Sequence, residues 1–127
     1  MNHYVLLCGG RDFGEFTGDE ERVVEAVRFL AVFYGDKLRV MHGAARGADR
    51  LGGKAAISFG VPVKEFPADW DTHGKKAGSI RNQRMLDYLL MCQRKGHSVQ
   101  VVAFPGGTGT ADMIRRAEAA GITVDHQ

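Results

Sequence analysis

The chain has only two cysteines, Cys8 and Cys92, and they are too few and too far apart for a disulfide framework or a zinc site. Its five histidines show no paired spacing that is typical of metal ligands. We therefore expect reduced thiols, a cytoplasmic location and no structural metal. No cofactor is expected.

Long hydrophobic runs are also missing. No apolar stretch approaches the roughly 20 residues that a membrane-spanning helix needs. The N-terminus lacks the basic region and long apolar core of a signal peptide. Charge of one sign is scarce as well, because 17 Lys and Arg against 15 Asp and Glu leave a formal net charge of +2. Such a mild excess does not argue for duplex nucleic acid or a membrane surface as a partner.

The composition is that of an ordinary globular protein, with 44% hydrophobic and 25% charged residues. A length of 127 residues leaves room for one hydrophobic core. No linker, repeat or low-complexity segment divides the sequence. We expect one domain over residues 1–127.

Apolar runs alternate with helical patterns along the chain. The expected strands are residues 4–7, 38–41, 61–66, 99–103 and 122–124. The expected helices are residues 19–34, 46–59, 85–90 and 108–120, with a polar loop at 67–79. Thr17 and Glu20 have the spacing of a capping box before the first helix. This alternation predicts an α/β fold, a Rossmann-like three-layer domain with a mainly parallel sheet of about five strands.

Three of the expected strands end in glycine-rich turns. Phe104 to Thr110 follow one strand and lead into a helix, His42 to Arg50 follow another, and Cys8 to Asp12 follow the first. In an open parallel sheet these turns meet at the carboxyl edge, where such folds bind ligands. A strand, a glycine turn and a helix start together present free N–H groups and a positive helix end to an anion. The pattern predicts a phosphorylated small molecule as ligand.

Positive charge gathers in one segment. Residues 72–84 contain Lys75, Lys76, Arg81 and Arg84 but no acidic residue. A local basic patch in a nearly neutral chain suits a small anionic ligand.

Five motifs in this order resemble the YspA and YpsA-related branch of the SLOG superfamily, and they extend over nearly the whole chain. They are Gly9 to Phe13, His42 to Asp49, Phe66 to Trp70, Gly78 to Asn82, and Phe104 to Thr110. The superfamily joins the SMF/DprA proteins with the Lonely Guy (LOG) phosphoribohydrolases. The resemblance implies a Rossmann-like fold whose glycine edge binds nucleotides or nucleotide-derived ligands, with activities that differ between branches.

Ligand contacts are expected from the glycine turns, from the basic segment and from the single tryptophan. The candidates are Gly9, Gly10, Arg11, Gly43, Ala44, Arg46, Gly47, Asp49, Trp70, Arg81, Asn82, Arg84, Pro105, Gly106, Gly107, Thr108, Gly109 and Thr110. Each has a structural alternative. In these alternatives the turns serve only to connect elements, and Arg46 and Asp49 form an ion pair at a helix start. The basic segment is a solvated helix end, and Trp70 anchors a loop instead of stacking a base.

The first functional hypothesis is a binding module, acting as a sensor, carrier or sequestering protein. The second is hydrolysis of a nucleoside 5'-monophosphate at its N-glycosidic bond. LOG enzymes read Pro-Gly-Gly-x-Gly-Thr-x-x-Glu, and Met113 stands here at the position of the glutamate. Asp112 precedes it by one residue, which rotates the side chain by about 100° around a helix. Asp112 or Asp49 is the candidate catalytic carboxylate, with Arg84 to orient the phosphate.

A third hypothesis, single-stranded DNA binding, follows from the DprA side of the resemblance. The modest charge and few aromatic residues disfavour nucleic acid as a partner. Relatives assemble through helix faces, so a homo-oligomer is possible, but apolar spacing does not separate an interface from a core.

Overall fold

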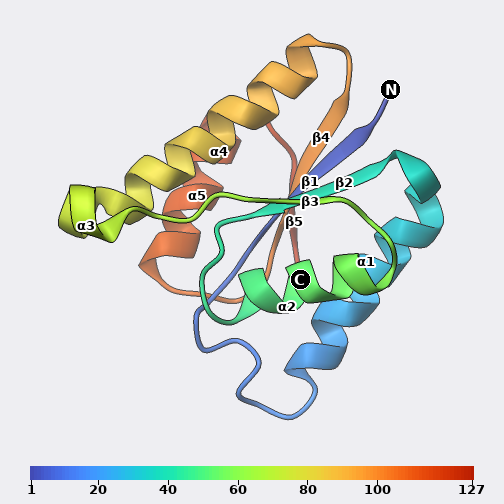
Figure 1. Cartoon of the computed structure of the whole chain (residues 1–127), viewed down its shortest axis with the longest axis horizontal. Coiled ribbons are helices and arrows are strands. Elements are labelled where there is room, and N and C mark those ends of the chain that lie inside the picture. Colours follow the sequence, from blue (N-terminus) through green and yellow to red (C-terminus); the bar gives the residue numbers. More distant parts are fainter.

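A five-stranded, all-parallel sheet forms the centre of the structure, a computed structural model that describes all 127 residues (Figure 1). Its strands are β1 (His3–Cys8), β2 (Leu38–His42), β3 (Val63–Glu65), β4 (Ser98–Ala103) and β5 (Val124–His126). They lie in the order β3-β2-β1-β4-β5. The expected α/β class, the number of strands and the parallel sheet are confirmed.

Two helices cover each face of the sheet. Helices α1 (Asp19–Tyr34) and α2 (Ala48–Ser58) lie on one face, and α4 (Ala77–Arg94) and α5 (Thr108–Ala119) lie on the other. Successive residues of β1 alternate between the two cores: Leu7 packs in the α1 and α2 core, and Leu6 packs in the α4 and α5 core. The three-layer, Rossmann-like arrangement follows from this double burial.

Two glycines inside α2 allow that helix to approach the sheet. A Cβ atom at Gly52 would overlap the Leu7 side chain, and one at Gly53 would overlap the His42 ring. Glycine costs about 1 kcal/mol relative to alanine in a helix interior. Here the missing side chains let helix and sheet pack closely.

The expected polar loop at residues 67–79 is wrong in part. The segment contains a short helix α3 (Trp70–His73), a 3-10 turn η2 (Gly74–Lys76) and the first turn of α4. Asp69 caps α3, because its Oδ1 accepts the Thr72 N–H at 3.1 Å. The sequence did not predict these helical turns, because the segment is mostly polar and lacks the apolar spacing of a helix. The helix expected at residues 85–90 is longer than predicted, because α4 begins at Ala77 and continues to Arg94.

The expected capping box is also wrong. The N-cap residue of α1 is Gly18, with φ of 92°, and no side chain caps the helix. Asp19 instead turns back toward the preceding loop, and its Oδ2 accepts the N–H groups of Gly14 (3.0 Å) and Phe16 (3.3 Å). Thr17 and Glu20 therefore have capping-box spacing without forming the box.

The two short edge strands differ from expectation in their bounds. The strand expected at 61–66 covers only Val63–Glu65, and that expected at 122–124 lies at Val124–His126. Val61 and Ile122 are buried just before these strands. Their burial produced the apolar signal, although they lie outside the strands themselves.

The outer face of α1 carries exposed apolar side chains near the end of the helix. Phe29, Val32 and Phe33 are largely exposed, and the rings of Phe29 and Phe33 stack with their centroids 6.1 Å apart. None of the helices combines the length and apolarity needed to cross a bilayer.

Candidate functional site

The backbone of Gly10 connects the three glycine turns through hydrogen bonds. Its N–H donates to the Pro105 carbonyl at 2.9 Å, and its carbonyl accepts the N–H of Ala48 at 3.2 Å. These bonds connect the turn after β1 with the turns after β4 and β2. The prediction that the three turns lie together at the carboxyl edge is confirmed. The chain leaves β1 toward β2 on one side, while β4 lies on the other, so this is the switch point where open α/β sheets bind ligands.

Several of the turn glycines are required by the packing of the turns on each other. A Cβ atom at Gly9 would lie 2.6 Å from Ala48 Cβ and 2.9 Å from Phe104 Cβ. One at Gly47, where φ is 85°, would overlap the Gly10 carbonyl. These glycines have a structural reason that is independent of any ligand.

Gly107 and Gly109 differ, because no atom lies within 4 Å of a Cβ added to either. Both line a cavity at the carboxyl edge of the sheet, and α5 begins between them at Thr108. The first N–H groups of a helix have no carbonyl partner within it. The α5 terminus therefore offers donors at the cavity wall.

The cavity has a volume of about 1190 Å³. Its walls come from the turns after β1, β2 and β4, from the loop between β1 and α1, and from the N-terminal parts of all five α-helices. The predicted site residues that line it are Gly9, Gly10, Arg11, Asp49, Trp70, Arg81, Asn82, Pro105, Gly106, Gly107, Thr108, Gly109, Thr110 and Asp112.

Five predicted residues, Gly43, Ala44, Arg46, Gly47 and Arg84, are not among those that line the cavity. Arg46 pairs with Asp12 at 3.1 Å in an exposed ion pair. Arg84 is exposed, and its guanidinium lies 6.0 Å from the centroid of the Phe66 ring.

The N–H groups of the turn after β2 are bonded to side chains of the protein. Asp49 Oδ2 accepts the N–H of Gly43 (3.1 Å) and of Ala45 (3.3 Å), and His42 Nδ1 accepts that of Ala44 (2.9 Å). The Gly43 carbonyl accepts Nη1 of Arg81. This turn holds Arg81 in place and has no free N–H from Gly43 to Ala45 for an anion.

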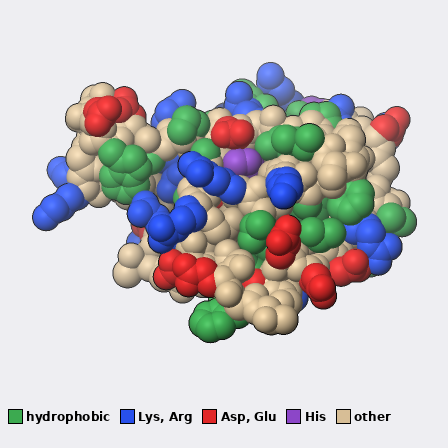
Figure 2. All heavy atoms as spheres, turned by 60° about the horizontal axis from the view of Figure 1, so that its bottom comes forward, with side chains coloured by type: hydrophobic (Ala, Val, Ile, Leu, Met, Phe, Trp, Pro, Cys, Tyr) green, Lys and Arg blue, Asp and Glu red, His purple; other side chains and the backbone are tan.

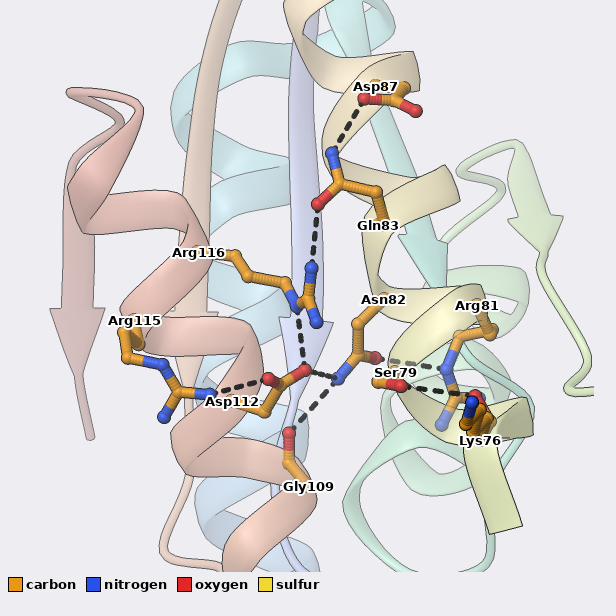
Figure 3. Close-up of polar contacts among 10 residues, drawn as sticks. All are labelled: Lys76, Ser79, Arg81, Asn82, Gln83, Asp87, Gly109, Asp112, Arg115 and Arg116. Carbon is orange, nitrogen blue, oxygen red and sulfur yellow. Dashed lines mark hydrogen bonds and ion pairs between the residues drawn. The ribbon is translucent and has the colours of Figure 1, made fainter.

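Asn82 connects α4 to the start of α5 (Figure 3). Its Nδ2 donates to the Gly109 carbonyl at 3.2 Å and to Asp112 Oδ2 at 3.0 Å, and its Oδ1 accepts Nε of Arg81 at 3.0 Å. The Asn82 side chain is buried. It fixes the position of Arg81 relative to the α5 terminus and has its polar atoms engaged within the protein.

Asp112 is held in an ionic network on α5 (Figure 3). Arg115 donates to it at 2.6 Å and Arg116 at 2.8 Å. Burial acts to raise its pKa, but the hydrogen bonds from Arg116 and Asn82 and the two arginine charges outweigh burial and lower the pKa. Met113 is buried in the core between the sheet and the helices.

Asp49 has the opposite shift. Burial raises its pKa to about 6, against the lowering effects of the Ala45 and Gly43 N–H groups and of the Arg81 and Arg11 charges. A carboxyl group with a pKa near neutrality in a cavity wall is a candidate proton donor or acceptor.

The remaining acids of the cavity wall are engaged by the protein. Asp12 pairs with Arg46, and Asp19 accepts the two N–H groups of the preceding loop. The cations Arg11, Arg22, Lys75 and Arg81 line the cavity without a carboxylate within ion-pair distance, so they set the sign of its charge. Figure 2 shows Lys and Arg side chains gathered beside the α3 segment, which protrudes at the left.

Sequence reasoning missed several residues that line the cavity. These are Asp12, Phe16, Asp19, Arg22, Ser79 and Arg115. Phe16 had no clear signal in the sequence, because Phe13 lies in the same loop and is buried in the core while Phe16 is exposed. No group of three or more His, Cys, Asp or Glu side chains is placed to hold a metal ion.

A model of the YspA, cpYpsA-related SLOG family matches residues 3–73. The chain belongs to this family. It is 42% identical over 127 residues to the Gene 61 protein of Mycobacterium phage D29, covering 94% of this chain and 92% of that protein. The X-ray structure of TM1055 from the Northeast Structural Genomics Consortium has the same fold, with a TM-score of 0.72 over 98% of this chain and 72% of that one, at 19% identity.

The resemblance seen in the five motifs is thereby confirmed. SLOG domains are implicated in binding nucleotide-related ligands. The family match covers the turns after β1 and β2, and Asn82, Arg81 and the α5 terminus lie beyond it.

The packing of the turns predicts different outcomes for two glycine substitutions. Gly9→Ala places a methyl group against Ala48 and Phe104 and is expected to lower the free energy of unfolding by about 1 to 3 kcal/mol. Gly109→Ala meets open space in a helix and is expected to leave stability unchanged or raise it by up to about 1 kcal/mol. Urea unfolding measures both. Equal effects of the two changes would contradict the close approach of the turns.

The raised pKa of Asp49 predicts a pH-dependent contribution to stability. The folded-state pKa of about 6 exceeds the ordinary value of 3.8, so this contribution is fully present below pH 3.8 and is lost as the pH rises through about 6. Between pH 4 and 7, the unfolding free energy of the wild type relative to Asp49→Asn should fall by about 1 to 3 kcal/mol. For Asp112→Asn the difference should have the opposite sign and should appear only as the pH falls below about 3.8, because the pKa of Asp112 is lowered from that value. A pH-independent difference for Asp49→Asn would refute the assignment.

Proposed function

We propose that this protein binds a nucleotide or a nucleotide-derived phosphorylated metabolite at the carboxyl edge of its sheet. The observation that carries the proposal is the start of α5, which opens onto the 1190 Å³ cavity between Gly107 and Gly109. The phosphate lies against the N–H groups of Thr108, Gly109 and Thr110, where the positive end of the helix dipole favours negative charge.

Arg81 and Arg11 complete the phosphate site. Arg81 is half-buried and fixed by the Gly43 carbonyl and by Asn82, so its guanidinium is held in place before a ligand arrives. A planar guanidinium binds phosphate oxygens through paired hydrogen bonds. Arg11 is exposed at the cavity wall and adds a second charge without a carboxylate partner within ion-pair distance.

Trp70 and Asp49 are the proposed contacts for base and ribose. The Trp70 ring is half-exposed at the cavity wall, with the Arg11 guanidinium 5.5 Å from its centroid. An indole ring of this kind stacks an unpaired base. The polar atoms of Asn82 are already bonded within the protein. Asp49 bonds to its own turn through Oδ2 alone, so its other oxygen is the proposed partner of a ribose hydroxyl. The protein then acts as a sensor, carrier or sequestering protein for the ligand.

Two arginines of α4 provide a matched test of the phosphate site. Arg81→Ala is expected to weaken binding of AMP by about tenfold or more, because a charge-assisted hydrogen bond to phosphate is lost. Arg84→Ala, which alters an exposed side chain outside the cavity wall, should leave AMP affinity unchanged. Calorimetric titration with AMP and with adenosine separates phosphate from base contacts. If Arg84→Ala weakened AMP binding as much as Arg81→Ala, the assignment of the site would fail.

Hydrolysis of the N-glycosidic bond is the second candidate function, and the pKa of Asp49 favours it. A carboxyl group that titrates near pH 6 inside a cavity is able to act as a general acid or base. Asp112 is less suited, because two arginines and Asn82 occupy its oxygens.

Incubation of the protein with nucleoside 5'-monophosphates, followed by mass spectrometry, tests this activity. Hydrolysis predicts free base and ribose 5-phosphate, with turnover abolished in Asp49→Asn and retained in Asp112→Asn. Intact nucleotides after prolonged incubation would leave the binding function alone.

A further inference from the structure

We infer that the ligand carries two bases joined through phosphate, with one base on Trp70 and the other on Phe16 at the opposite side of the α5 terminus. The inference rests on the proposed phosphate site and extends it to a class of ligand, a dinucleotide.

The size of the cavity is the first observation. Its volume of about 1190 Å³ exceeds the roughly 300 to 1,000 Å³ of typical small-molecule pockets. A mononucleotide whose phosphate sits at α5 and whose base sits on Trp70 leaves the side toward the loop after β1 unfilled. A second nucleoside attached to the same phosphates extends into that side.

Phe16 is the second observation. Its side chain is 76% exposed, yet it lines the cavity. Its backbone is fixed at both ends, because the N–H donates to Asp19 Oδ2 at 3.3 Å and the carbonyl accepts the Asp19 N–H at 3.1 Å. Asp19 is buried, so the loop presents the ring from an anchored position. Among the exposed aromatic side chains, Phe16 and Trp70 are the two that line this cavity, where a flat ring offers a face on which a base can stack.

The two rings lie on different sides of the site. Trp70 begins α3 and Phe16 lies in the loop between β1 and α1, and Figure 1 shows these segments on separate sides of the molecule with the start of α5 between them. Residues 106–110 line the same cavity as both rings. A ligand with phosphates in the middle and a flat ring at each end matches this order.

The distribution of charge fits phosphates at the centre. Arg11 and Arg81 line the cavity together with the α5 terminus, while Asp12, Asp19 and Asp112 are engaged by other groups of the protein. The Trp70 and Phe16 rings line the same cavity as these cations. Base stacking on such rings tolerates different bases, so the site accepts two bases of any identity.

Trp70 is the only tryptophan of the chain, so intrinsic fluorescence reports on one of the two proposed stacking positions directly. The probes are ADP and diadenosine 5',5'-diphosphate, which share the diphosphate and differ in the second adenosine. The wild type is expected to bind the two-base probe about tenfold more tightly than ADP. This gain does not come from charge, because the second esterification removes an ionisable oxygen from the diphosphate.

Phe16→Ala is expected to remove this gain and to leave ADP affinity within about twofold, since the second base alone contacts Phe16. Phe16→Tyr should retain the gain. Phe29→Ala removes another exposed aromatic ring, on α1 and outside this cavity, and should change neither affinity. Because both phenylalanines are largely exposed, the variants are expected to fold as the wild type does.

Equal affinity of the wild type for the two probes, or an equal loss for both in Phe16→Ala, would overturn the two-base inference while leaving the phosphate site standing. Absence of binding by ADP, AMP and the two-base probe alike would overturn the proposed function itself, and the inference with it.

Discussion

The site depends on the two hydrogen bonds that the backbone of Gly10 makes. Its N–H and its carbonyl hold the turn after β4 and the start of α2, respectively, against the turn after β1. This contact requires backbone atoms to approach closely, which explains why Gly9 and Gly47 carry no side chain. Because Pro105 is held in this way, the glycines that follow it and the start of α5 have a fixed position at the edge of the sheet. The cavity forms around that fixed point.

The three turns are all rich in glycine, but they have different roles in the site. The turn after β2 satisfies its own N–H groups through Asp49 and His42 and supplies a carbonyl that positions Arg81. The turn after β4 leads into α5, whose first N–H groups have no carbonyl partner within the helix and whose first residues line the cavity. Asn82 links the two, because it holds both the Arg81 guanidinium and the Gly109 carbonyl. An anion at the α5 terminus therefore meets donors and a guanidinium whose relative positions are set before binding, which lowers the entropic cost of binding.

The sequence was sufficient for the fold and for the meeting of the three glycine turns at one edge of the sheet, since apolar periodicity marks the strands and helices, and parallel strands bring their carboxyl ends together. It was not sufficient to show that the N–H of Gly43 is bonded within its turn, whereas Gly107 lies at the cavity wall. Whether a turn N–H is free depends on an acceptor such as Asp49, whose direction is a property of the folded turn. The same holds for Arg81 and Arg84, which are alike in sequence and differ by the rotation of α4. Phe16 was missed because a single aromatic residue in a loop has no periodicity to reveal it.

The most direct test of the account is the response of the backbone N–H groups to a phosphate. In ¹⁵N-labelled protein titrated with AMP and, in parallel, with adenosine, the amide resonances of Gly107, Thr108, Gly109 and Thr110 are expected to shift most with AMP and little with adenosine. The amides of Gly43 and Ala45, already bonded to Asp49, should move less. Shifts centred on Gly43 and Ala45, or equal shifts with adenosine and AMP, would contradict a phosphate site at the start of α5.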